Sequence, residues 1–355
     1  MLFQRDLVEE KLDSGKQTGR DYLQKIIQVP FDIPKIEPTR VQNLLFKEIE
    51  NILEQDSSAV DMFDSGYWGN LFHGSLHMYF DNLRNVYRFS STLSFHFSLL
   101  RGKRVFEVNP VDLIAIECLR FFEPDIYQEI ARSKDVFTGH NAAKRSNKVV
   151  IEHILESSTN GKEKYVKELV EQIFPNTTSQ YGEDFYKEWL REMRVYHPSN
   201  FDKYFQFTIP SGKLSNSDLL KMLELAANSE NFIAFINSLK ERNILRNALS
   251  KFESYIEKIP LENAAPFIRA ILDVGYSVDH DTSGFAMTSS NLHLVRLVIW
   301  FLKRNEDIAS RSQLLLKCFK ESNGLSIVES ILQGDENRRE KPREPLFCQT
   351  VSLRN

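Results

Sequence analysis

The residues after position 36 carry apolar side chains that recur every three or four positions. In the first such stretch Val41, Leu45, Ile49 and Ile52 share one face of a helix, and charged residues such as Glu50 lie on the other face. The 355 residues include only 14 Gly and 12 Pro, and this scarcity disfavours a turn-rich all-β fold. The pattern therefore predicts a predominantly α-helical chain.

Several helix starts can be recognised from their capping residues. Asn109 is followed by Pro110 and by Asp112 in the first turn, a combination that begins helices. We expect that helix to end at residue 123, a second helix to start at Pro124, and Ser215 or Ser217 to cap a later one. Further helices are expected at residues 82–100, 149–157, 163–174, 183–194, 230–257, 264–274, 290–304, 308–321 and 325–332. The breaker-rich stretch 198–212 is interpreted as a connection.

The first residues have a different pattern. Residues 1–4 look like the end of a buried strand, residues 6–12 like an amphipathic helix, and residues 22–31 like a short strand closed by prolines. This order predicts a strand–helix–strand fragment of an α/β unit. Because parallel strands need neighbouring strands and helices on both faces, we expect that the rest of the unit lies upstream of this chain.

Charge and cysteine usage exclude several classes of protein. There are 45 Lys and Arg against 49 Asp and Glu, so the net charge of −4 gives no reason to expect nucleic acid as a partner. Cys118, Cys318 and Cys348 form no C-x-x-C pair, which argues against a zinc site or a disulfide framework. The longest apolar stretch, residues 292–302, is too short and too polar to span a bilayer, so we expect a soluble, cytoplasmic chain.

Local motifs that carry chemistry are weak. His73 and His77 have the spacing of a two-histidine metal site but lack a third ligand, and residues 279–281 (DHD) are better interpreted as a polar loop. Two basic clusters are interpreted as solvated faces, and the aromatic run after residue 200 as the packing of a connector rather than a stacking platform. These clusters comprise Arg101, Lys103, Arg104, Lys144, Arg145 and Lys148, and the run comprises Phe201, Tyr204, Phe205 and Phe207.

Three stretches together resemble the KAP family of P-loop NTPases. The first resembles the later strands of the core, the second the helical region that follows, and the third the family's "FDRYF" segment. They are residues 5–8 with 19–34, residues 108–127 (VNPVDLIAIECLRFFEPDIY), and residues 200–205 (NFDKYF) followed by 209–210 and 214–215. The resemblance implies a downstream portion of an ATP-binding α/β core followed by a helical lid. It also implies a family that is often membrane-associated and includes bacterial, defence-linked ATPases.

The phosphate- and magnesium-binding motifs of that family are missing from the sequence. A P-loop needs G-x-x-x-x-G-K-[ST], but each Gly-Lys pair, for example Gly15-Lys16 and Gly161-Lys162, is followed by a residue without a hydroxyl group. No apolar run ends in the acidic pair of a Walker B motif. We therefore expect no cofactor in this chain, although ATP and Mg²⁺ are expected for the full-length family, and the chain's status as an enzyme stays open.

Residues 83–89 (LRNVYRF) resemble a family segment that opens a lid helix. Arg84 and Arg88 lie one turn apart on that helix, and either guanidinium is a candidate sensor of the nucleotide's γ-phosphate. The alternative is that both arginines lie on a solvated face or are paired with carboxylates. These two residues are the site prediction; no catalytic residue and no metal ligand is predicted.

The resulting division is residues 1–36 as a partial NTPase core, 37–136 as a helical lid, 137–214 as a helical insertion and connector, 215–334 as a C-terminal helical region and 335–355 as a flexible tail. The leading hypothesis is a lid, sensory or partner-binding region that does not bind or hydrolyse ATP alone. A protein partner, or a separately encoded N-terminal NTPase half, is the expected partner. The alternative is a stand-alone helical interaction scaffold without a nucleotide role.

Overall fold

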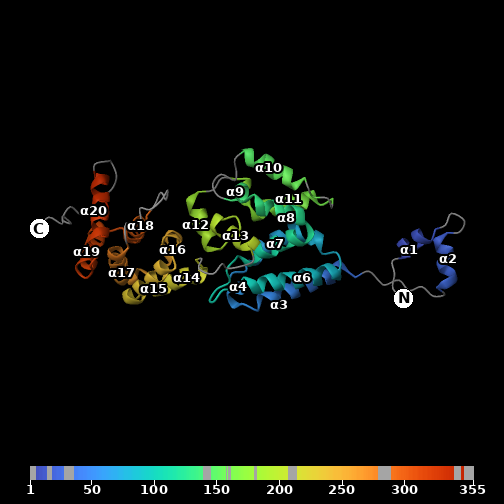
Figure 1. The fold of residues 1–355 in the computed structure, drawn as a ribbon, viewed down its shortest axis with the longest axis horizontal. Coiled ribbons are helices and arrows are strands. Elements are labelled where there is room, and N and C mark those ends of the chain that lie inside the picture. The colour runs from blue at the N-terminus through green and yellow to red at the C-terminus, as the bar shows by residue number, and fades with distance from the viewer. Residues whose placement is uncertain are drawn as a thin grey trace.

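The computed structural model describes residues 5–13, 18–27, 36–138, 145–156, 158, 161–179, 182–206, 214–278, 289–339 and 345–347. Over these residues the protein is almost entirely helical (Figure 1). No strand is present in this described part, and an isolated antiparallel bridge between Arg101 and Phe106 is its one β-type pairing. The helical prediction is therefore confirmed, and the strand–helix–strand fragment is not observed.

A first helical unit is built around one continuous apolar core that draws on residues 41–204. Its helices are α3 (Pro38–Leu53), α4 (Ser57–Asp61), α5 (Ser65–Gly74), η1 (Leu76–Tyr79), α6 (Leu83–Leu99), α7 (Pro110–Phe122), α8 (Pro124–Arg132), α9 (Lys134–Phe137), α10 (Arg145–Leu155), α11 (Glu163–Ile173), η2 (Pro175–Thr177), α12 (Glu183–Arg191) and α13 (Pro198–Gln206). The helix α7 lies at the centre of this unit, because every residue from 110 to 119 is buried and α5, α6, α8 and α11 pack around it.

A second helical unit has its own core, formed by residues 214–347. Its helices are α14 (Asn216–Leu225), α15 (Ser229–Glu241), α16 (Leu245–Phe252), η3 (Glu253–Lys258), η4 (Leu261–Asn263), α17 (Ala264–Ser277), α18 (Ser290–Lys303), α19 (Ile308–Lys320) and α20 (Leu325–Arg339). The helix α17 is central here and packs against α15, α18, α19 and α20. Two glycines permit the close approach: a Cβ on Gly275 would lie 2.2 Å from Ile327, and one on Gly324 would lie 2.4 Å from Leu272.

The N-terminal segment corrects one prediction. Residues 22–26 of the expected strand 22–31 belong instead to the helix α2 (Gly19–Ile26), which packs on α1 (Arg5–Leu12), and residues 28–31 lie outside the described residues. The side chain of Thr18 caps α2 by accepting a hydrogen bond from the Asp21 N–H, and Tyr22, Leu23 and Ile26 are spaced as on one helical face. Apolar residues with this spacing fit either a short strand or a short amphipathic helix. The cap at Thr18 stabilises the helix. The other predicted strand, residues 1–4, lies outside the described residues.

Three further boundaries differ from the expectation. The expected helix 230–257 is divided into α15, α16 and η3, and the break between α15 and α16 falls at Asn243, whose positive φ of 57° ends a right-handed helix. The expected connection 198–212 begins with the helix α13, in which Pro198 occupies the first turn rather than breaking the helix. At the C-terminus α20 continues to Arg339, and Leu346 and Phe347 are buried in the second core although they belong to the expected tail.

Among the described residues, no helix has both the length and the apolar character needed to cross a bilayer.

Candidate functional site

The two predicted sensor arginines lie on the outer side of α6. Asn82 caps this helix by accepting a hydrogen bond from the Asn85 N–H at 2.8 Å, and the cap sets the register that places Arg84 and Arg88 one turn apart and exposed to solvent. The guanidinium carbon of Arg88 lies 4.9 Å from the centre of the Phe121 ring. Arg84 forms no ion pair with the described residues. Both side chains can therefore be reached from solution.

The residues that follow α6 join the two helical units. Glu107 is fully buried, and its carboxylate accepts hydrogen bonds from Nζ of Lys203 at 2.8 Å and from the backbone N–H of Asn216 at 2.9 Å. The Asn216 side-chain amide donates to the backbone carbonyl of Glu107 at 3.2 Å. On the outer rim, Arg104 pairs with Glu224 at 2.5 Å. The loop between α6 and α7 is thus bonded directly to the first turn of α14.

The start of α14, where the carboxylate of Glu107 lies, favours a negative charge. Asn216 and Ser217 are the first residues of α14, where backbone N–H groups have no partner within the helix and the helix dipole favours an anion. The carboxylate of Glu107 meets those N–H groups from the first unit, while Ser215 and Asp218 close the same helix end with a capping box. Lys203 neutralises the buried charge from α13. We call this set of contacts around Glu107 the joint.

The first unit also holds two buried carboxylates on α7 that are fully engaged. Asp112 accepts hydrogen bonds from Tyr67 (2.8 Å), from Nε of Arg194 (2.9 Å) and from the Val195 N–H (2.8 Å). Glu117 contacts His96 at 3.0 Å and Arg120 at 2.5 Å. Burial alone would raise the pKa of Glu117, but the hydrogen bonds from His96 and Arg120 outweigh it and lower that pKa. Because their oxygens are already satisfied, these carboxylates have a structural role.

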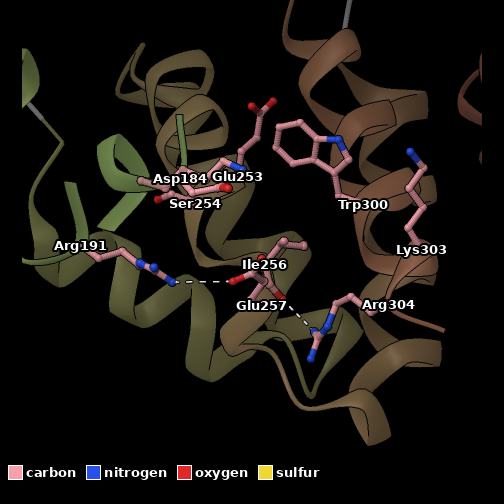
Figure 2. A pocket seen from close by; sticks show the side chains of 10 residues that line it. Asp184, Arg191, Glu253, Ser254, Ile256, Glu257, Trp300, Lys303 and Arg304 are labelled. Carbon is pink, nitrogen blue, oxygen red and sulfur yellow. Dashed lines mark hydrogen bonds and ion pairs between the residues drawn. The ribbon is translucent and has the colours of Figure 1, made fainter. Parts of the chain in front are cut away.

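A groove runs along the boundary between the units, beside the joint. Its first wall is α12, which packs against η3, and its second wall is formed by α16, η3 and α18 (Figure 2). Two cavities of about 300 and 270 Å³ share four lining residues: Lys187, Glu253, Ser254 and Trp300. They are therefore parts of one groove. Clefts between structural units are common places for ligands.

One charged pair crosses the groove at one end, and a second arginine there binds backbone carbonyls within one wall. Arg191 from α12 lies 4.0 Å from Glu257 of η3, and Arg304 donates hydrogen bonds to the backbone carbonyls of Ile256 at 2.9 Å and Ile259 at 2.6 Å (Figure 2). The Arg304 contacts satisfy carbonyl groups near the end of η3. These interactions position η3 between α12 and α18.

Lys251 lies at the other end of the groove and is partly buried. Burial, together with the positive charges of Lys203 and Lys134, lowers the pKa of Lys251 to about 8, although Glu107 acts in the opposite direction. No carboxylate forms an ion pair with Lys251 within the described residues. The groove therefore ends at a cation that lacks a direct partner in this part of the chain.

The remaining motifs of the sequence are not assembled into sites. The ring of His77 lies 3.2 Å from the Phe72 carbonyl and His73 packs on Phe72, and no group of three or more metal-binding side chains occurs among the residues that the structure describes. Residues 279–281 lie outside the described residues. Phe201 and Tyr204 are buried in the first core, as expected for the packing of a connector. Phe207 also lies outside the described part.

Sequence reasoning did not identify the joint or the groove. Glu107 had a recognisable signal, because it is a lone carboxylate between Val105, Phe106 and Val108, and such an apolar setting indicates a buried charge. No comparable sequence signal pointed to the groove residues Lys187, Lys251 and Trp300. They are far apart in the sequence and lie on three different helices.

Comparison with known families gives one match. Residues 5–100 match the model of the KAP family P-loop domain. No curated protein and no solved structure matches the chain. The matched segment runs from the start of α1 to the residue after α6, so it contains Arg84 and Arg88 and ends directly before the loop that forms the joint.

Proposed function

We propose, from the match of residues 5–100 to the KAP family P-loop domain, that this chain is a helical lid and regulatory region of a KAP-type NTPase. In this proposal the first unit covers the nucleotide site, and Arg84 and Arg88 approach the γ-phosphate from α6. The second unit reports the state of a partner or ligand to that lid. The chain alone does not bind or hydrolyse ATP, because its sequence has no Walker A phosphate loop and no Walker B carboxylate.

The observation that carries the proposal is the joint. The family segment ends at residue 100, and Glu107, seven positions later in the sequence, is bonded to the first turn of α14. A displacement of α6 therefore acts on a buried charged contact that belongs to both units. A buried charged contact holds one preferred geometry rather than a continuous range of positions. An element that couples two units needs such discrete geometries.

Nucleotide binding is tested by titrating ATP with Mg²⁺ onto the purified chain in a calorimeter and by measuring phosphate release. We expect neither specific binding nor turnover. Tight binding accompanied by hydrolysis would refute the proposal, because the chain would then contain a complete NTPase site.

Coupling is tested separately by amide hydrogen exchange on Glu107→Gln. We expect faster exchange both in the last turns of α6 and in α14, because the joint holds both elements. A matched control is Glu129→Gln, which removes one partner of the exposed ion pair with Arg132 (2.8 Å) and should leave both segments unchanged. Faster exchange in α14 alone would contradict a coupling role.

A stand-alone interaction scaffold is the second candidate. The observation in its favour is that the core of the second unit is formed wholly from residues 214–347, separately from the first core. Expression of residues 214–347 alone tests it: a folded fragment that binds the same protein partner as the full chain favours the scaffold. Loss of partner binding on removal of residues 5–206 favours the regulatory region.

A further inference from the structure

The groove between the units has the size and shape of a small-ligand site. Its two cavities, of about 300 and 270 Å³, meet at Trp300 and Ser254, and ligand sites in proteins span roughly 300–1,000 Å³. The walls come from two units with separate cores, so a ligand placed there would contact both.

Trp300 gives the groove a planar apolar surface. The side chain extends from α18 toward Glu253 and Ser254 of η3 in the same wall, and it is only partly buried (Figure 2). The Nζ atom of Lys187 on α12 lies 5.5 Å from the centre of the indole ring. A flat π-system beside a cation suits a ligand that carries both a ring and a negative charge.

The acidic residues of the groove are already engaged by neighbouring side chains. Glu253 lies 2.6 Å from Nδ1 of His293 and 4.0 Å from Arg296, and Glu257 lies 4.0 Å from Arg191. Asp184 contacts Lys187 at 3.4 Å, where both side chains extend into solvent. Their charges are thus largely balanced within the wall, and they do not exclude an anion.

The basic side chains of the groove are not all paired with carboxylates among the described residues. Lys251 is partly buried without an ion pair in the described part of the chain, close to Lys203 and Lys134. Its lowered pKa is the response expected of an ammonium group that lacks a counter-ion. An anionic group placed between Lys251 and Lys187 would supply that counter-ion.

We propose that this groove binds a small phosphorylated ligand with a planar ring, of the mononucleotide class. The ring lies against Trp300 and the phosphate group lies between Lys187 and Lys251. This site is built from residues 184–304 and is separate from the matched family segment, so the inference goes beyond the proposed function. It requires no hydrolysis and no metal ion.

The test is calorimetric titration of the full chain with AMP and with UMP, in the absence of Mg²⁺. Adenosine and inorganic phosphate serve as half-ligands. We expect both nucleotides to bind, and each half-ligand to bind at least tenfold more weakly. The absence of binding at millimolar nucleotide, or equal binding of phosphate alone, would overturn the proposal.

Substitutions then locate the site. Trp300→Leu and Lys251→Met should each weaken AMP binding roughly tenfold, in line with the contribution of one stacking or charge contact, whereas Trp300→Phe should retain most of it. Lys187→Met, at a half-exposed position where α12 lines the groove, should weaken binding without affecting folding. Lys148→Met, an exposed lysine on α10, is the control. Binding that survives all three groove substitutions would refute this location, and the isolated chain gives this answer even if the NTPase role fails.

Discussion

The carboxylate of Glu107 lies 2.9 Å from the backbone nitrogen of Asn216, so one buried side chain of the first unit completes the N-terminal turn of a helix in the second. The loop that carries Glu107 begins directly after α6. This loop therefore links the end of α6 to the first turn of α14.

Glu107→Gln is expected to destabilise the chain by about 3 kcal/mol, because it leaves the ammonium group of Lys203 buried without its partner. The measurement is urea unfolding followed by circular dichroism. The double variant Glu107→Gln with Lys203→Met removes both members of the pair and should recover part of this loss. A double variant that is less stable than the single one would show that the two charges do not form the pair.

Asp112→Asn tests the other buried pair of the first unit. The amide group of Asn would face the guanidinium of Arg194, so we expect a loss of about 3–5 kcal/mol in the free energy of unfolding. The control is Glu129→Gln in the exposed pair with Arg132, which should change stability by less than about 1 kcal/mol. Similar midpoints of urea unfolding for the two variants would contradict this account of α7.

Two glycines in the second unit form a matched pair. A Cβ on Gly275 would lie 2.2 Å from Ile327, whereas a Cβ on Gly334 in α20 would meet nothing within 4 Å. Gly275→Ala should therefore cost about 1–3 kcal/mol through overpacking, and Gly334→Ala should be neutral or stabilise by up to about 1 kcal/mol. Thermal melting of both variants checks this. The cost of Gly275→Ala should be smaller in an Ile327→Ala background, because that change removes the Cγ1 and Cδ1 atoms that the new Cβ would meet.

Local capping signals account for the parts of the fold that were predicted. The starts of α7 at Asn109 and of α14 at Ser215 follow from side-chain oxygens that accept backbone hydrogen bonds, and these interactions span two or three residues. The strand expected around residues 22–31 is replaced by a helix over residues 22–26, because apolar spacing in a short segment fits both periods and the side chain of Thr18 caps the helix. Pro198 was interpreted as a breaker although the first turn of a helix tolerates it.

The candidate site was less accessible to prediction for a physical reason. The i, i+4 spacing of Arg84 and Arg88 is local, so it placed both on one face of α6; their role at the nucleotide stays a prediction. The groove depends on Lys187, Lys251 and Trp300, which only tertiary packing brings together. A single sequence contains no signal for such distant pairs.

Lys251 gives a prediction for the dependence of stability on pH. Burial and the charges of Lys203 and Lys134 lower the pKa of Lys251 to about 8, with Glu107 opposing, whereas an unfolded lysine titrates near 10.4. Between these values the unfolded chain binds more protons than the folded one, so the Lys251 contribution to the free energy of unfolding rises with pH over this window. Below pH 8 both states are protonated and the full penalty of the buried charge is present.

Lys251→Met should remove that penalty. We expect the variant to be more stable than the wild type by on the order of 2 kcal/mol at pH 7, and we expect the difference to shrink as the pH approaches 10.4. Urea unfolding at several pH values measures the difference directly, and Lys148→Met on the exposed side of α10 should show no such dependence. A gain that stays constant from pH 7 to 10 would mean that the variant acts through packing rather than charge. Saturation with AMP should raise the stability of the wild type more than that of the variant, because the phosphate group supplies the counter-ion that Lys251 lacks among the described residues.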